Sequence, residues 1–290
     1  MNNSDKTRRL PLEGAVAEAT EGVFVRILYV LIFISILATI ALWLGKYGVI
    51  RKKVAMITAC ASLLCGGALL AMAVLPGNSF YGETITGGKV ADGKKLVALT
   101  FDDGPYPPFT QELVAVLEEK QVKATFFVVG NNAAKFPDIV KLAASKGHEI
   151  ALHAGEHKDF LKLNSSELTG NISSGKKVLE ELTVKPVKYM RPPHGFRDWA
   201  VMEEASKVGL TVVNWSVIPR DWTNPGAKEI ADRVCKDAFP GAIVLLHDGD
   251  APAQKASREQ TVQATSIIID ELRQKGYEFV TIDELIRSNL

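Results

Sequence analysis

Two long apolar runs stand near the start of the chain, at residues 27–44 and 54–75, and neither contains a charged side chain. An α-helix rises about 1.5 Å per residue, so about 20 residues cross the ~30 Å hydrocarbon layer of a membrane. Both runs are therefore predicted to be transmembrane helices. A polar tail, residues 1–26, precedes them. The loop between them, residues 45–53, is strongly basic and contains Lys46, Arg51, Lys52 and Lys53.

The basic loop also predicts which way the chain crosses the membrane. Cytoplasmic loops are enriched in Lys and Arg, so residues 45–53 are expected in the cytoplasm and the remainder of the chain outside. We therefore expect a cell-membrane protein with two spans and an extracytoplasmic C-terminal domain. The alternatives are the inverted orientation, two buried core helices, and a signal peptide cleaved after residues 71–73. That signal would lie behind another apolar run, which favours a retained anchor.

From residue 95 onward, short apolar runs alternate with longer segments of helical spacing. The short runs predict strands at 96–101, 124–129, 148–153, 187–192, 210–216, 242–247 and 277–282. The segments between them predict helices at 108–120, 133–146, 166–182, 198–208, 226–238 and 258–275. This alternation is typical of an α/β fold with a parallel sheet, and residues 95–290 suffice to close the sheet into a barrel. The Gly-rich stretch at 76–94 is predicted to be a linker.

Composition and charge narrow the possible partners. The chain has 34 Lys and Arg against 33 Asp and Glu, a net charge of +1, so it offers no overall basic character for binding nucleic acid. A hydrophobic content of 47% excludes a disordered chain. Of the three cysteines, only Cys235 lies in the C-terminal domain, so no disulfide framework is expected there. The sequence does not identify a protein partner.

Polar and reactive side chains follow the predicted strands at their carboxyl ends, where ligands bind in parallel α/β folds. Five of the seven strands deliver such residues to this end: Asp102 and Asp103, His153 with His157, Arg191 with His194, Asp221 with Trp222, and His247 with Asp248. By contrast, His148 and Glu149 begin a strand and are expected to be structural.

Two imidazoles and one carboxylate from different strands form a site for a catalytic divalent metal with open positions. His153 and His157 supply the imidazoles, and either Asp102 or Asp103 supplies the carboxylate. The other aspartate then becomes a general base, and His247 can protonate a leaving nitrogen. A zinc-like ion would activate a water molecule and polarise a carbonyl group.

Each of these residues also has an ordinary structural interpretation. The Asp-Asp-Gly-Pro stretch is a common turn, and two histidines four residues apart occur by chance. Asp221 and Asp248 could cap helices, Arg191 could be a surface charge on a proline-rich turn, and the tryptophans at 199, 215 and 222 could belong to the core. The hydrolytic interpretation is favoured because all these residues share one end of one predicted fold.

Residues 95–290 resemble the polysaccharide deacetylases, the NodB-homology domain of carbohydrate esterase family 4. The resemblance rests on five motifs in order: TFDDGP at 100–105, HAGEH at 153–157, RPPHG at 191–195, RDW at 220–222 and LLH at 245–247. It implies a distorted (β/α) barrel of seven or eight strands and a metal-dependent deacetylase.

The resemblance also implies a role for each matching residue. Asp102 would be the general base, and Asp103, His153 and His157 would be the metal ligands. Arg191 would orient Asp102 and keep it ionised, and Asp221 would favour the protonated, acidic form of His247. A backbone N–H near His194 would meet the oxyanion, and the acetyl pocket would be formed by Pro193, His194, Trp222 and Leu245.

The chain departs from the family pattern at three positions. Ala154 stands where Ser or Thr is usual, His194 where an aromatic residue such as Tyr is usual, and Ile218 where many members carry an acid. None of these changes removes a ligand, the base or the acid. They affect the expected substrate preference rather than the expected chemistry.

We therefore expect a membrane-anchored deacetylase with a divalent metal ion, with Zn²⁺ favoured over Co²⁺, Ni²⁺ or Mn²⁺. The expected substrate is an N-acetylated glycan, with peptidoglycan N-acetylglucosamine ahead of chitin-like oligosaccharides. Two alternatives remain: an O-acetyl esterase acting on xylan-like polymers, and a non-catalytic, membrane-tethered glycan-binding module.

Overall fold

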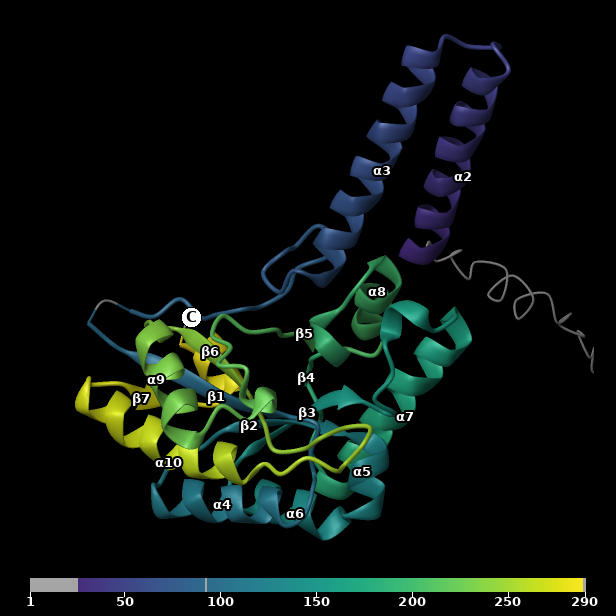
Figure 1. Ribbon diagram of the computed structural model, residues 1–290. Coiled ribbons are helices and arrows are strands. Elements are labelled where there is room, and N and C mark those ends of the chain that lie inside the picture. The colour runs from purple at the N-terminus through teal and green to yellow at the C-terminus, as the bar shows by residue number, and fades with distance from the viewer. Residues whose placement is uncertain (1–25, 92, 289–290) are drawn as a thin grey trace, which may run out of the picture.

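The computed structural model describes residues 26–91 and 93–288, and its centre is a curled parallel sheet (Figure 1). The strands follow the order β5-β4-β3-β2-β1-β6, and β7 pairs with the first two residues of β1. Their bounds are β1 Leu96–Asp102, β2 Thr125–Val129, β3 Glu149–Ala154, β4 Tyr189–Met190, β5 Thr211–Val212, β6 Ala242–His247 and β7 Glu278–Phe279. Just after β5, Val217 forms a parallel bridge with Val244 of β6, which joins the two edges of the sheet. The predicted α/β barrel is thus confirmed in a distorted form.

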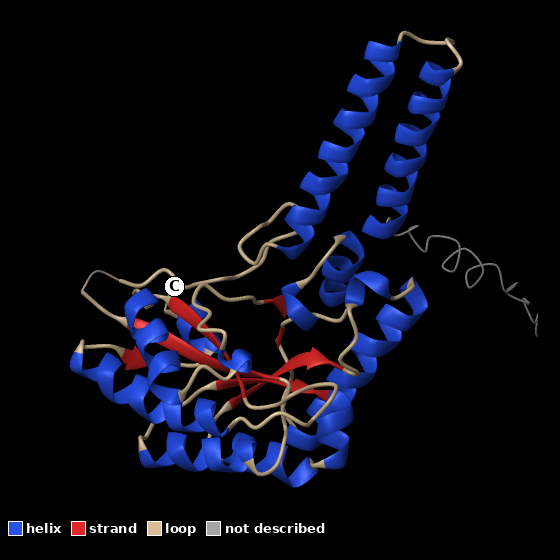
Figure 2. Ribbon diagram, viewed as in Figure 1, coloured by secondary structure: helices blue, strands red, loops and turns tan. Residues whose placement is uncertain are grey.

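Helices cover the outside of this barrel (Figure 2). Those of the C-terminal domain are α4 Phe109–Glu119, α5 Gly130–Lys135, α6 Pro137–Ser145, α7 Ser165–Thr183, α8 Trp199–Lys207, α9 Ala227–Asp237, α10 Glu259–Gln274 and α11 Ile282–Arg287. Short 3₁₀ turns occupy Phe160–Lys162, Pro193–Gly195 and Asp221–Thr223.

Both faces of β1 and β2 are buried, which explains why these strands appear in the sequence as continuous apolar runs. In β1, Val97, Leu99 and Phe101 pack in the layer that also contains residues of the surrounding helices. The alternate residues Leu96 and Ala98 belong to a second, smaller cluster. Ile282 and Leu285 of α11 are buried in that same cluster, together with Phe127 of β2 and Ile243 of β6.

Several predicted elements differ from the structure in their extent. The strands predicted at 187–192, 210–216 and 277–282 shrink to two residues each. Pro192 has no N–H with which to extend β4. Thr281 ends the β7 region because it begins α11 with a capping box to Glu284. The helix predicted at 133–146 is two helices, because Pro137 starts α6 and leaves Phe136 outside helical geometry.

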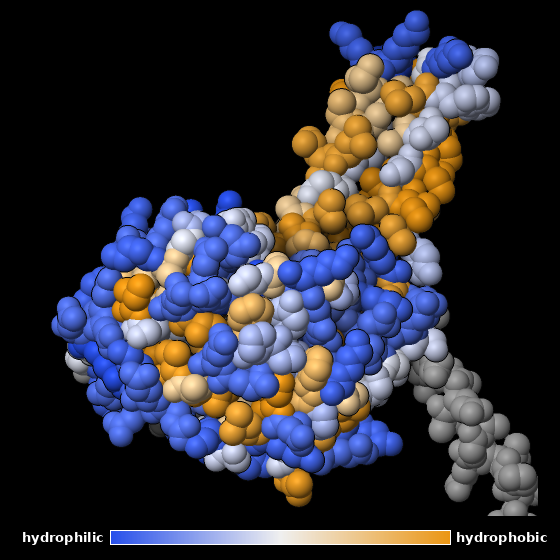
Figure 3. All heavy atoms as spheres, turned by 60° about the horizontal axis from the view of Figure 1, so that its bottom comes forward, coloured by the Kyte–Doolittle hydropathy of each residue, from blue (hydrophilic) through white to orange (hydrophobic). Residues whose placement is uncertain are grey.

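The two apolar runs form α2 (Ile27–Lys46) and α3 (Lys52–Val74), a helical hairpin that projects from the domain (Figure 1). Both helices are long and apolar enough to cross a membrane, and only 17% of each apolar window is buried. This exposure contradicts the alternative of buried core helices. In Figure 3 the sides of the hairpin are hydrophobic, and hydrophilic residues gather at its far tip. The predicted polar tail, apart from Arg26, lies outside the described residues.

The near ends of the hairpin are bound to the domain. Arg26 forms an ion pair of 3.3 Å with Asp198, and the N–H of Ile27 donates to the same carboxylate. The N–H of Arg197 donates to the carbonyl of Ala73, 3.1 Å away. The buried guanidinium of Arg197 donates to the carbonyls of residues 75, 76 and 78. The hairpin is therefore held in place by the chain that leads into α8.

The stretch interpreted as a linker, residues 76–94, lies along the domain over part of its length. Ile85 forms a parallel bridge with Val213, and Gly87 forms an antiparallel bridge with Ala242. Tyr81 is buried with 4% of its surface exposed. The segment therefore continues the attachment of the hairpin to the sheet.

Glycines allow α7 to approach the end of β3, and this contact yields a matched pair of variants. A Cβ at Gly175 would lie 2.7 Å from the backbone N of Gly155, whereas a Cβ at Gly170 of the same helix would meet nothing within 4 Å. We expect Gly175→Ala to lower the free energy of unfolding by about 1–3 kcal/mol, because the backbone must move. Gly170→Ala should raise it by about 0.5–1 kcal/mol through helix propensity. Urea unfolding of the detergent-solubilised protein checks this, and shifts of the same sign in both variants would contradict it.

Candidate active site

A tight turn at the end of β1 sends two adjacent aspartates to one site. Asp103 adopts φ +77°, which few residues other than Gly do and which breaks the strand alternation. The amide of Asn132 donates to the carbonyl of Asp103 at 3.0 Å, and the N–H groups of Asp248 and Gly249 donate to the carbonyl of Asp102 at 3.2 Å. At Gly104 a Cβ would collide with the Asp248 carboxylate, so the turn requires Gly there.

The Asp103 carboxylate lies between two imidazoles. Its Oδ1 is 3.3 Å from Nε2 of His153 and 3.3 Å from Nε2 of His157. One donor atom from each of the three residues lies within 4.8 Å of the others. Ligands about 2.1 Å from one tetrahedral ion stand about 3.4 Å apart, so this spacing fits a metal such as zinc. Of the two aspartates that the sequence left open as ligand, the structure brings Asp103 into this group.

The electrostatics of the group also fit a cation. Oδ1 of Asp103 is buried and has no hydrogen-bond partner among the described residues. Burial opposes its charge, but the imidazoles of His153, His247 and His157 outweigh burial and hold the Asp103 pKa well below its usual value. Burial and the neighbouring His153 lower the pKa of His157 to about 4, which keeps it neutral, as a ligand must be.

A backbone contact fixes which nitrogen of His153 faces Asp103 and His157, the other two candidate metal ligands. Its Nδ1–H donates to the carbonyl of Arg191 at 2.8 Å, because a carbonyl can only accept. The lone pair of Nε2 is then directed toward Asp103. Such an outer hydrogen bond is what orients histidine ligands in metalloproteins.

Asp102 is held by a buried guanidinium. Nη1 of Arg191 lies 2.6 Å from Oδ1 of Asp102 and 2.9 Å from the hydroxyl of Thr100. The other nitrogens of Arg191 donate to the carbonyls of Val213 and Asn214, and its Cζ lies 4.0 Å from the centre of the Phe127 ring. Arg191 is fully buried, so the interpretation as a surface charge is wrong.

His247 is paired with a second buried carboxylate. Its Nδ1 lies 2.8 Å from Oδ1 of Asp221, whose Oδ2 accepts from the N–H of His247 and from the hydroxyl of Thr261. Burial alone would lower the pKa of His247, but Asp221 raises it to about 9. Asp221 itself has a lowered pKa, because His247 and these hydrogen bonds outweigh its burial. Asp221 therefore favours the protonated imidazolium form of His247.

These groups line a cavity of about 490 Å³ at the carboxyl ends of the strands. Asp102, Asp103, His153, His157 and His247 lie on it together with the apolar side chains of Phe196, Trp215, Ile218, Trp222 and Leu245. The ring of Trp222 lies edge-on to His247 with centroids 5.3 Å apart. His194, at φ +60°, also lines the cavity and contacts the ring of His157. Pro193 is buried and does not line the cavity.

The sequence did not single out several residues of this cavity. Arg258 at the start of α10 and Asp250 after β6 form an ion pair of 3.0 Å in its wall. Val74, the last residue of α3, also lines it. No motif marked Arg258, and Val74 belongs to a predicted span, so only the tertiary structure shows their place.

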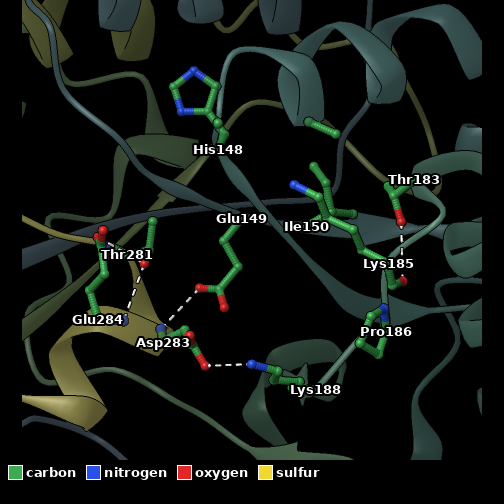
Figure 4. A pocket seen from close by; sticks show the side chains of 12 residues that line it. His148, Glu149, Ile150, Thr183, Lys185, Pro186, Lys188, Thr281, Asp283 and Glu284 are labelled. Carbon is green, nitrogen blue, oxygen red and sulfur yellow. Dashed lines mark hydrogen bonds and ion pairs between the residues drawn. The ribbon is translucent and has the colours of Figure 1, made fainter.

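A second cavity, of about 330 Å³, lies at the opposite ends of the strands (Figure 4). Glu149 accepts hydrogen bonds there from Thr125 and from the N–H of Asp283, and Lys188 pairs with the Asp283 carboxylate. Figure 4 shows these groups paired with one another and the His148 ring turned away from them. The structural interpretation of His148 and Glu149 agrees with this arrangement.

Comparison with known proteins gives consistent similarities over the C-terminal domain. A family model for polysaccharide deacetylases matches residues 89–213. A peptidoglycan-N-acetylglucosamine deacetylase of Bacillus cereus is 39% identical over 201 residues, 69% of this chain and 92% of that protein. A chitooligosaccharide deacetylase of Bradyrhizobium is 36% identical over 200 residues, 67% of this chain and 91% of that protein.

Solved structures give the same result. The crystal structure of the Bc1960 peptidoglycan N-acetylglucosamine deacetylase has a TM-score of 0.65 and 34% identity, and covers 70% of this chain and 92% of its own. A structure described as a CE4 family pseudoenzyme from Bacillus anthracis has a TM-score of 0.63 and 27% identity, and covers 70% and 68% of the two chains. Similarity of fold alone therefore does not separate enzymes from inactive relatives.

The geometry predicts which histidines hold the metal. We expect His157→Ala to lower metal affinity at least about tenfold, because it removes one of three ligands. His194→Ala is the matched control, since its ring contacts His157 but is not part of the Asp103 group. Metal content after dialysis against a weak chelator, measured by mass spectrometry, checks the pair. Equal metal loss from both variants would contradict the assignment.

Proposed function

Because this chain belongs to the polysaccharide deacetylase family, we propose that it is a membrane-anchored, metal-dependent enzyme that hydrolyses the N-acetyl groups of peptidoglycan N-acetylglucosamine. The observation that carries the proposal is the shared cavity. The same cavity of about 490 Å³ is lined by three functional groups: the candidate metal ligands, the Asp102 carboxylate that Arg191 fixes, and the imidazole of His247. A metal ion, a general base and a general acid together can catalyse the hydrolysis of an amide.

The reaction divides among the residues as follows. Asp103, His153 and His157 would hold the ion, which when bound would lower the pKa of a water molecule and polarise the acetyl carbonyl. Asp102 accepts the proton of the attacking water, and Arg191 fixes its Oδ1 and its orientation. His247 gives its proton to the departing nitrogen as the carbon–nitrogen bond breaks. The products are acetate and a free amine on the sugar.

Apolar walls suit the acetyl methyl group. Trp222 and Leu245 lie on the cavity beside His247, so a methyl group there is removed from water while the amide nitrogen faces the imidazolium. His194 lies in the short turn after β4 at φ +60°, and its N–H is the proposed donor to the oxyanion. Pro193 is proposed only to stiffen this turn, because it does not reach the cavity.

The metal is proposed to be Zn²⁺, with Co²⁺, Ni²⁺ and Mn²⁺ as alternatives. Two imidazole nitrogens and one carboxylate oxygen suit zinc. The same donors also bind other first-row divalent ions, in the order set by their intrinsic affinities.

The substrate proposal draws on the relatives. Two similar proteins of Bacillus cereus are peptidoglycan-N-acetylglucosamine deacetylases, and several others are chitooligosaccharide deacetylases. Chitin-like oligosaccharides are therefore the second candidate. The alternative of a non-catalytic module, represented by the pseudoenzyme relative, is opposed by the complete set of metal, base and acid groups. An O-acetyl ester could enter the same site, but it needs less help from an acid such as His247.

The membrane anchor is proposed from the hairpin. The basic residues Lys46 and Arg51 lie at the tip far from the domain, which by the positive-inside rule supports an extracytoplasmic domain at the cell membrane. Arg26 and Ile27 are bound to the domain, so the first span stays attached to it and a cleaved signal peptide is disfavoured. We propose residues 27–75 as the anchor and 95–290 as the catalytic domain, joined by the packed segment 76–94.

The first test removes the base. Asp102→Asn keeps the shape but cannot accept a proton, so acetate release from N-acetylglucosamine oligosaccharides should fall by about 10²–10⁴. Asp232→Asn on the surface of α9 is the control and should leave the rate unchanged. Chelation should abolish acetate release by the unaltered protein, and added zinc should restore it. A rate unaffected by either Asp102→Asn or chelation would refute the proposed reaction.

The second test concerns pH. His247 has a pKa raised to about 9, so it is protonated at neutral pH, and kcat/KM should fall as the pH rises through about 9. The Asp221–His247 ion pair contributes its full stabilisation of the folded protein below about pH 6.5. This stabilisation is lost as the pH rises through about 9. Asp221→Asn removes the charge that raises this pKa, so the alkaline limb should move at least about one unit lower. An unmoved limb would show that His247 is not the acid.

A further inference from the structure

The catalytic cavity lies directly against the end of a membrane helix. Val74, the last residue of α3, lines it together with Asp103 and His157. The stretch of α3, 23 residues long, rises about 34 Å, which matches the ~30 Å hydrocarbon layer. Val74 then stands at the edge of the hydrocarbon, so one wall of the cavity lies at the membrane boundary.

The contacts at the base of the hairpin hold this position. Arg197, fully buried, donates to the backbone of residues 75, 76 and 78 and also to the carbonyl of Gly195 in the turn that carries His194. Arg26 binds Asp198, the residue that caps α8. One short segment, 194–198, therefore joins the cavity wall to both spans.

Aromatic side chains of the domain mark the same level. The rings of Phe80, Tyr81 and Trp199 contact one another with centroids 4.7–5.6 Å apart. The hydroxyl of Tyr81 donates to the carbonyl of Leu69, which lies five residues inside α3. Phe80 and Trp199 remain partly exposed, at 48% and 38%. Aromatic residues of this kind concentrate at the interface between hydrocarbon and water.

The other end of the hairpin carries a matching pair. The rings of Trp43 and Tyr47 contact each other at the tip, with their centroids 4.9 Å apart and their planes tilted by 50°, and Lys46 lies over the Tyr47 ring. The hairpin thus has aromatic residues at both ends of its apolar length. The near set includes Trp199, which begins helix α8 of the catalytic domain, so this edge of the domain lies in the headgroup layer.

We propose that the substrate is an N-acetylated saccharide covalently joined to a membrane lipid. The inference rests on the proposed deacetylase function and adds the distance from the membrane surface at which the sugar is bound. The headgroup layer extends only about 5–8 Å beyond the hydrocarbon, so a sugar attached to a lipid is held where the cavity lies. A polymer in the cell wall would have to descend to the lipid surface to reach it.

The test compares two lipid-linked substrates in vesicles that contain the full chain. One carries an N-acetylglucosamine trisaccharide joined directly to a dialkyl lipid, and the other carries it on a long ethylene-glycol spacer. Both are confined to the same membrane, so surface concentration does not distinguish them. We expect kcat/KM for the directly joined sugar to equal or exceed that for the spaced sugar. A value more than about tenfold lower would overturn the proposal.

A variant that combines a flexible Gly-Ser insertion between Leu75 and Pro76 with Arg26→Gln provides a second comparison, because it loosens the attachment of the domain to both spans. In this variant the ratio of kcat/KM for the directly joined sugar to kcat/KM for the spaced sugar should fall by about tenfold or more. An unchanged ratio, with turnover retained, would overturn the proposal.

The free trisaccharide separates this inference from the proposed function. If free and spaced sugars are deacetylated but the directly joined sugar is not, the lipid-linked substrate is wrong and the deacetylase proposal stands. If none of the three releases acetate, both are wrong.

Discussion

The site depends on one buried carboxylate held between two imidazoles. Oδ1 of Asp103 has no donor among the described residues, yet it lies 3.3 Å from two histidine nitrogens. A buried charge without a partner is costly, and a divalent cation is the partner that these three groups share. The positive φ of Asp103, the Gly at 104 and the contacts from the loop after β6 all serve to keep the carboxylate there.

Around this carboxylate the barrel gives two other groups partners of opposite charge. The buried Arg191 forms an ion pair with Asp102 and donates a hydrogen bond to the carbonyl of Val213, just after β5. Asp221 forms an ion pair with His247 and favours its protonated form. A base and an acid are thus kept apart on one cavity by their different partners. The hairpin adds a further constraint, because Val74, the last residue of the apolar helix α3, lines the same cavity.

Much of this arrangement could be predicted from the sequence, because the buried parallel strands carry continuous apolar runs and their ends carry the reactive residues. The TFDDGP turn, both histidines of HAGEH, Arg191, Asp221 and His247 were found this way, and the structure brings them together. Choosing between Asp102 and Asp103 as the ligand needed the family resemblance, since only the backbone turn separates their directions. The short strands β4, β5 and β7 and the break at Pro137 were missed because tertiary pairing sets their extent. Val74 and Arg258 could not be found, because nothing local marks a residue that reaches the site through the fold.

The most direct measurement of the central claim is anomalous X-ray diffraction from crystals of the full chain grown with zinc. The account predicts one strong peak at the zinc edge, within about 2.0–2.3 Å of Oδ1 of Asp103 and of Nε2 of both His153 and His157. A zinc-replete crystal with no peak between these atoms, or with the ion bound by other side chains, would contradict it.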